Sequence, residues 1–139
     1  MGYTHYWDKP QAMTAEEWKA LTVRARQILT YAQDMMGIAL SEDYDVNKPP
    51  IVDELQIRFN GYEDEGHETF HLFPGPIAFD FCKTARKPYD APVVAILMEA
   101  ARIAPDAFSW SSDGDGEPEL KEQAQFILDA IDPPEEEIP

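Results

Sequence analysis

The sequence has a single cysteine, few basic residues and no long hydrophobic run. One cysteine in 139 residues excludes an internal disulfide, which fits a reducing compartment. No apolar stretch approaches the roughly 20 residues that a membrane-spanning helix needs. Met1 leads directly into polar and aromatic residues, so we also expect no signal peptide. These absences predict a cytoplasmic protein without a membrane partner.

The shortage of basic residues has a second consequence. Lysine and arginine total 11 against 27 aspartates and glutamates, which gives a formal net charge of −16. Direct nucleic-acid binding is therefore not expected, because phosphate contacts require clustered lysine and arginine. The charge fits a solvated acidic surface, or a protein that presents carboxylates to a basic partner. With 44% hydrophobic residues the chain can bury a core, and we expect one domain over residues 1–132 and an acidic flexible tail over 133–139.

The clearest local pattern is an amphipathic helix in the first quarter of the chain. Thr14 and Glu17 have the spacing of a capping box, and apolar residues then recur at helical spacing from Trp18 to Met35. Gly37 supplies the stop. This apolar stripe predicts a core-facing helix.

Two further helices follow later in the sequence. Asp90 is a good N-cap, and the segment from there to Pro105 is apolar nearly all round, which predicts a central helix. A third helix begins near Pro118. Residues 38–53, which hold two consecutive prolines, predict a long connection.

Four strands are expected from short runs rich in aromatic and β-branched residues, at 3–7, 56–61, 67–73 and 107–111. A turn at Asn60–Gly61 would end the second strand, which forms a hairpin with the third around an acidic loop. Residues 77–82 fit either an additional strand or an extended lead-in to the next helix. The fold class predicted is α+β, an antiparallel sheet with the β-α-β-β-α-β order of a ferredoxin-like sandwich plus a C-terminal helix.

A cluster of cations precedes the central helix. Lys83, Arg86 and Lys87 lie in the segment 81–90, just before the helix start at Asp90. Helix N-termini present free N–H groups and partial positive charge, so nearby cations would complete an anion site. The alternative is that these cations only neutralise surrounding acids on the surface.

Aromatic residues and histidines suggest a second part of this site. In a ferredoxin-like sheet the first and third strands are neighbours, so Tyr3, His5 and Trp7 would share an open face with His67 and His71. Such a surface stacks bases in RNA-recognition domains, and here it would take a single nucleotide or another planar ligand. The alternative is that these side chains belong to the core.

Two further motifs resemble parts of known catalytic sites. Residues 67–71 match H-E-x-x-H, but a zinc protease needs this motif on a helix, and these residues resemble a strand cut short by Pro74. Cys82 and Arg86 have C-x3-R spacing rather than the C-x5-R of a phosphatase loop, and we expect a buried, inert thiol. No cofactor or metal is predicted.

The sequence contains the segments Gly2–Trp7, Phe59–Gly61, His67–Phe70, Phe81–Asp90 and Ser111–Gly114. Together these segments resemble a family of small bacteriophage and prophage proteins with no assigned activity. The resemblance implies a phage or mobile-element origin and work in the host cytoplasm, and it supplies no catalytic residues.

The function expected is that of a phage-type accessory protein that binds, without catalysis, a small anionic ligand or nucleotide, in counter-defence or by engaging a host protein. The candidate binding residues are Tyr3, His5, Trp7, His67, Lys83, Thr84, Arg86, Lys87, Tyr89 and Asp90. Two alternatives stay open: an acidic inhibitor of a host protein that imitates nucleic acid, and a metal-dependent hydrolase acting through His67, Glu68 and His71.

Overall fold

The structure is a computed structural model that describes residues 3–131, so the predicted acidic tail at 133–139 lies outside the described residues. The elements in chain order are β1 (Thr4–Lys9), α1 (Ala15–Asp34), β2 (Leu40–Ser41), β3 (Ile51–Val52), β4 (Ile57–Gly61), η1 (Glu63–Glu65), β5 (Phe70–Leu72), β6 (Ile77–Lys83), α2 (Asp90–Ile103), β7 (Ser109–Ser112), η2 (Pro118–Lys121) and α3 (Glu122–Ile131). None of the helices in this part of the chain is long and apolar enough to cross a membrane.

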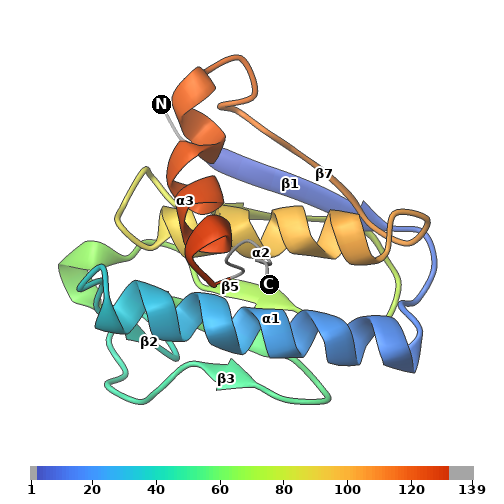
Figure 1. Ribbon diagram of the computed structural model, residues 1–139, viewed down its shortest axis with the longest axis horizontal. Helices are drawn as coiled ribbons and strands as arrows, with labels where there is room; N and C mark the ends of the chain where they lie inside the picture. The colour runs from blue at the N-terminus through green and yellow to red at the C-terminus, as the bar shows by residue number, and fades with distance from the viewer. Residues whose placement is uncertain (1–2, 132–139) are drawn as a thin grey trace, which may run out of the picture.

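The strands form two antiparallel sheets. One sheet has the order β6-β1-β7. In the other, β4 pairs with β5 along one edge and with the two-residue strands β2 and β3 along the other edge. In Figure 1, β1 and β7 run beside α2, whereas β2 and β3 lie on the side of α1.

The predicted α+β class and C-terminal helix are confirmed, but the ferredoxin-like strand order is wrong. The strand expected beside β1 was β5, and β5 pairs with β4 in the other sheet. The neighbours of β1 are β6 and β7. With seven residues β6 is the longest strand, and it occupies the place that the ferredoxin-like order gives to the third strand.

The first helix follows its sequence signals. Thr14 Oγ1 accepts a hydrogen bond from Glu17 N at 3.0 Å, and Glu17 Oε1 accepts one from Thr14 N at 2.9 Å, which completes the predicted capping box. The apolar stripe is buried from Trp18 to Ala32, with Leu21 and Ile28 fully covered, whereas Met35 just past the helix end is 70% exposed. Past the helix end, Gly37 has a φ of 70°, a backbone conformation that glycine adopts without strain.

Helix α2 is the centre of the core, as its apolar sequence predicts. Val93, Ile96 and Leu97 have no exposed surface, and α2 packs against α1, α3 and β7. Figure 1 shows α1 and α2 running alongside one another, with α3 crossing in front of α2. Because α2 is buried along most of its length, the residues at its start are held in position by the surrounding core.

The predicted turn at Asn60–Gly61 is not observed, because both residues belong to β4. Asn60 is fully buried, and its side-chain amide donates to His67 O and Thr69 Oγ1, both at 3.0 Å. The hairpin is closed instead by the acidic turn of η1, which confirms the predicted acidic loop. Asparagine here serves as a buried hydrogen-bonding group that holds the loop.

Candidate functional site

The segment between β6 and α2 forms a tight turn with an unusual backbone. Lys87 N donates to Thr84 O at 3.0 Å, and the two residues between them, Ala85 and Arg86, have φ values of 54° and 58°. Left-handed backbone costs a non-glycine residue about 1 to 2 kcal/mol. The turn is held because Thr84 N and Ala85 N both donate to Tyr3 O, at 3.1 and 3.4 Å. Such strain concentrates at functional sites.

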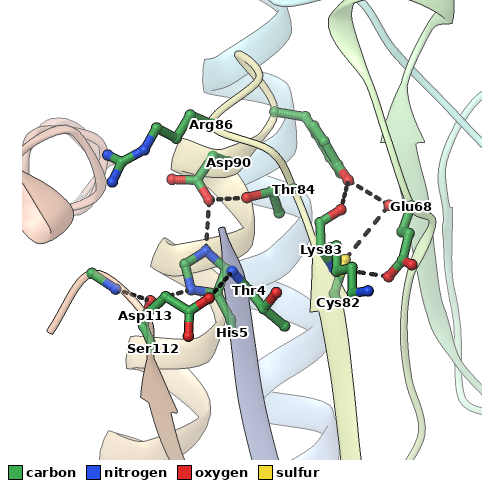
Figure 2. Close-up of polar contacts among 12 residues, drawn as sticks. Thr4, His5, Glu68, Cys82, Lys83, Thr84, Arg86, Asp90, Ser112 and Asp113 are labelled. Carbon is green, nitrogen blue, oxygen red and sulfur yellow. Dashed lines mark hydrogen bonds and ion pairs between the residues drawn. The ribbon is translucent and has the colours of Figure 1, made fainter. Parts of the chain in front are cut away.

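A chain of buried hydrogen bonds fixes the start of α2. Thr84 Oγ1 donates to Asp90 Oδ1 at 2.6 Å, and His5 Nε2 lies 2.6 Å from the same oxygen. On its other side His5 Nδ1 is 2.8 Å from Ser112 Oγ, which accepts from Gly114 N at 3.0 Å. Figure 2 shows His5 between Ser112 and Asp90, so the chain joins β7, β1 and α2.

Asp90 therefore has a role other than the predicted cap. Its carboxylate bonds to side chains of β1 and the turn, no side chain caps the helix, and Tyr89 occupies the N-cap position. Asp90 Oδ2 accepts no hydrogen bond from the described residues. In Figure 2 this second oxygen points away from Thr84. It is a hydrogen-bond acceptor available to a ligand.

The serine, histidine and aspartate of this chain of hydrogen bonds match the residue types of a hydrolase triad. The serine hydroxyl is nevertheless occupied, since it bonds to the histidine ring and to Gly114 N. Ser112 and His5 are both buried, with 9% and 0% of their surface exposed. A substrate carbonyl thus has no approach, and the arrangement is structural.

A hollow of about 600 Å³ opens at the start of α2. Its walls come from the residue before β1, the segment that follows α1, the turn before α2, the first turn of α2, and the region of η2 and the start of α3. The lining residues are Tyr3, Met36, Ile38, Arg86, Lys87, Pro88, Asp90, Ala91, Glu117, Glu119, Glu122 and Gln123. We call it the α2 hollow. It contains four of the ten predicted site residues: Tyr3, Arg86, Lys87 and Asp90.

Arg86 is already engaged at the rim of the α2 hollow. Its guanidinium forms two hydrogen bonds with the carboxylate of Glu117, at 3.0 and 2.9 Å, and covers the ring of Tyr3 at 3.9 Å from the centroid. The hydrogen bond from Arg86 lowers the pKa of the Glu117 carboxyl. Burial, followed by the charge of Asp90, raises the pKa of Tyr3 to about 12, so its hydroxyl is neutral at physiological pH.

The remaining charges of the α2 hollow are mixed. Lys87 makes no ion pair with any described residue, and it is half-buried. The carboxylates of Glu119 and Glu122 lie on the opposite wall with Glu117, and Asp90 lies at the helix start. Two cations thus face four carboxylates, which differs from the simple cationic site that the sequence predicts. Glu117, Glu119 and Glu122 come from the region where the sequence predicts that the third helix begins, and no sequence signal places them near Arg86.

Three of the other predicted residues lie away from the α2 hollow. Trp7 is buried against Phe70, with ring centroids 5.4 Å apart. His67 is exposed in the connection before β5. Lys83 points to the outer face of the β6-β1-β7 sheet, where its Nζ lies 6.0 Å from the centroid of Phe81. The predicted open face shared by Tyr3, His5, Trp7, His67 and His71 is therefore wrong, because the first three face the core and the two histidines belong to the other sheet and its loop.

Tyr89 and Cys82 are also structural. The Tyr89 hydroxyl donates to Glu68 O and Lys83 O. Cys82 Sγ lies 3.5 Å from Glu68 O (Figure 2). Burial raises the pKa of the Cys82 thiol to about 12 and raises the pKa of Tyr89 as well. Both groups stay protonated, so neither acts as a nucleophile or charged ligand.

The H-E-x-x-H segment lacks the helix that a zinc protease requires. His71 lies in β5, and Glu68 uses its Oε1 to accept a hydrogen bond from Lys83 N at 2.8 Å. Across residues 3–131 there is no group of three or more histidine, cysteine, aspartate or glutamate side chains that could hold a metal ion. In comparisons with known proteins, no family model, no curated protein and no solved structure matches this chain.

Proposed function

We propose that this protein is a non-catalytic binding protein whose α2 hollow takes a small ligand that carries hydrogen-bond donors and one anionic group. The observation that carries the proposal is the convergence of Lys87, Arg86 and the free oxygen of Asp90 on one hollow at the start of α2. Its volume of about 600 Å³ is typical of small-molecule sites. Buried polar contacts and backbone strain fix these groups before any ligand arrives.

The mixed charge of the hollow supports a particular ligand chemistry. A bare anion would be attracted by Lys87 but repelled by the carboxylates of Glu119 and Glu122. A nucleotide suits this arrangement better, because its base offers N–H donors to Asp90 while its phosphate pairs with Lys87. The apolar floor of Ile38 and Ala91 would cover the planar base.

The phage resemblance supports a setting for this activity. A phage-type accessory protein in the host cytoplasm can act without catalysing a reaction, by sequestering a host nucleotide signal. Sequestration requires only affinity and abundance, which fits a site without an accessible nucleophile or metal cluster among the described residues.

The test is calorimetric titration of the full chain with inorganic phosphate, nucleosides, and linear and cyclic nucleotides. We expect heat with at least one nucleotide and weaker binding with the matching nucleoside or phosphate alone. Lys87→Ala should weaken binding about tenfold, as expected for loss of one charge-assisted contact. Lys83→Ala, which removes a cation from the outer sheet face, should leave it unchanged. Absence of heat with every compound would overturn the proposal.

A further inference from the structure

The face of the β6-β1-β7 sheet that points away from α2 carries exposed aromatic side chains. Alternation along β1 and β6 turns His5 and Cys82 to the core and Tyr6, Phe79 and Phe81 to the opposite side. Phe79 is 58% exposed and Phe81 is 44% exposed. Large aromatic side chains with this exposure lie together on one face here, and such apolar surface marks an interaction site.

The three rings form a continuous row. The ring centroids of Tyr6 and Phe79 are 6.0 Å apart at an interplanar angle of 27°, and those of Phe79 and Phe81 are 6.1 Å apart at 36°. Beside the row, Ser109 and Ser111 of β7 are small and leave a hollow of about 200 Å³ bounded by Tyr6 and Phe79. We call the row and this hollow the outer aromatic face.

Two exposed carboxylates flank the outer aromatic face. Asp8 Oδ1 accepts from Ser109 Oγ at 2.8 Å, and Asp113 Oδ1 accepts from the Tyr6 hydroxyl at 2.9 Å. Asp113 Oδ2 also accepts from the backbone N–H of Thr4 at 3.1 Å. All three donors are neutral, and neither carboxylate forms an ion pair with a described residue. Each aspartate is thus held in place by a hydroxyl and still lacks a counter-ion.

We propose that the outer aromatic face is a docking surface for an arginine-bearing segment of a partner protein. A guanidinium is planar, stacks on aromatic rings and donates two parallel hydrogen bonds to a carboxylate. Tyr6 and Phe79 supply the stacking surface, and Asp8 supplies the carboxylate. The charge of −16 attracts a cationic segment and repels both a nucleic acid and a second copy of this chain.

This inference is independent of the proposed nucleotide site. The α2 hollow lies on the core side of the sheet, at the start of α2, and shares no lining residue with the hollow beside Tyr6. Loss of one activity by substitution should therefore leave the other intact.

The experiment measures binding of capped peptides to the full chain by fluorescence anisotropy. One peptide alternates arginine with glycine, and a second has lysine in place of arginine. We expect the arginine peptide to bind about fivefold more tightly than the lysine peptide, and Phe79→Ala to weaken it about fivefold. The matched control is Phe126→Ala on α3, since Phe126 is also 58% exposed, and it should bind as the wild type does. Asp8→Asn should weaken binding about threefold.

Three results would overturn the proposal. The first is equal binding of the arginine peptide by the wild type and Phe79→Ala. The second is equal affinity for the lysine peptide, which would mean attraction by net charge alone. The third is that another partner occupies the face. This would be seen if a single-stranded oligonucleotide bound more tightly than the arginine peptide, or if the protein self-associated in sedimentation and Phe79→Ala abolished the self-association.

Discussion

At the scale of single residues, Asp90 links the candidate site to the core. One of its carboxylate oxygens bonds to both Thr84 and His5, while the other faces no partner among the described residues. Its backbone begins the most buried helix of the protein. The position of the free oxygen is therefore set by groups that also hold the fold together.

Asp90→Ala should lower the free energy of unfolding by about 2 to 4 kcal/mol, because it removes the partner of two buried groups, His5 Nε2 and Thr84 Oγ1. Urea unfolding followed by circular dichroism measures this change. Asp106→Ala is the matched control, since Asp106 is exposed and makes no hydrogen bond through its side chain in the described structure, and it should shift stability by less than about 0.5 kcal/mol. Equal stability of the two variants would contradict the structural role of Asp90.

Cys82 should resist thiol reagents in the folded protein. Burial raises the pKa of this thiol to about 12, so almost no thiolate forms at pH 8. Treatment with Ellman's reagent should release colour only after urea is added. Rapid reaction of the native protein would contradict the burial of this side chain. The sequence predicted an inert thiol from the apolar strand around it, and its burial is confirmed.

At the same scale, the partner of Arg86 could not be predicted. The sequence indicates that cations gather before α2, but Glu117 is 31 positions away and meets Arg86 only through the folded chain. A local pattern carries no information about such a pair. The sequence thus predicted the two cations and Asp90 of the candidate site, but not the carboxylates of Glu117, Glu119 and Glu122.

At the scale of elements, the turn before α2 stores backbone strain that a glycine would relieve. Ala85→Gly should raise the free energy of unfolding by about 0.5 to 1 kcal/mol, since the left-handed φ of 54° penalises alanine and not glycine. The control is Ala20→Gly within α1, at a position that is exposed as Ala85 is, and it should lower stability by about 1 kcal/mol. Denaturant midpoints measure both changes, and a loss of stability in Ala85→Gly would refute the strained turn.

Helices α1 and α2 are joined by a buried carboxylate. Glu99 accepts from Arg24 Nε at 3.0 Å and from Arg102 at 2.7 and 3.1 Å. Burial alone would raise the pKa of Glu99, but these hydrogen bonds and the two positive charges outweigh it and hold the pKa below its usual range. The carboxylate form is therefore the one that stabilises the fold.

Glu99→Gln should cost about 1 to 3 kcal/mol of unfolding free energy at pH 7. A group with a lowered pKa contributes stability above its unfolded pKa of about 4.3 and loses it as the pH falls through its folded value. The difference between wild type and variant should therefore shrink as the pH is lowered below about 4.3. Urea titrations at a series of pH values measure it, and a difference that persists unchanged to pH 2 would contradict this assignment.

The sequence predicts elements well where local signals are complete. The capping box of α1 and the apolar residues all round α2 correctly predicted both helices. It fails for β2 and β3, since two-residue strands show no alternation and exist only because β4 offers them an edge. The predicted turn at Asn60 is also wrong, because the Asn60 side chain is buried and makes hydrogen bonds that hold the residue in the strand.

At the scale of the whole molecule, strand pairing decides where the site lies. Element order alone suggested a ferredoxin-like sheet, yet β1 pairs with β6 and β7 and turns His5 toward α2. Pairing depends on contacts distant in sequence, so order and periodicity do not determine it. That the acidic surface imitates nucleic acid stays a prediction. It requires binding to a basic host protein, and the affinity of this binding should fall steeply as the salt concentration rises.

The central claim is that the α2 hollow binds a nucleotide. The most direct measurement is a nitrogen-15 NMR titration of the full chain with linear and cyclic nucleotides. The account predicts saturable shifts at the backbone amides of Lys87, Ala91 and Gln123, which line the hollow. Absence of shifts with every nucleotide at millimolar concentration, or shifts confined to the outer aromatic face at Phe79 and Phe81, would contradict it.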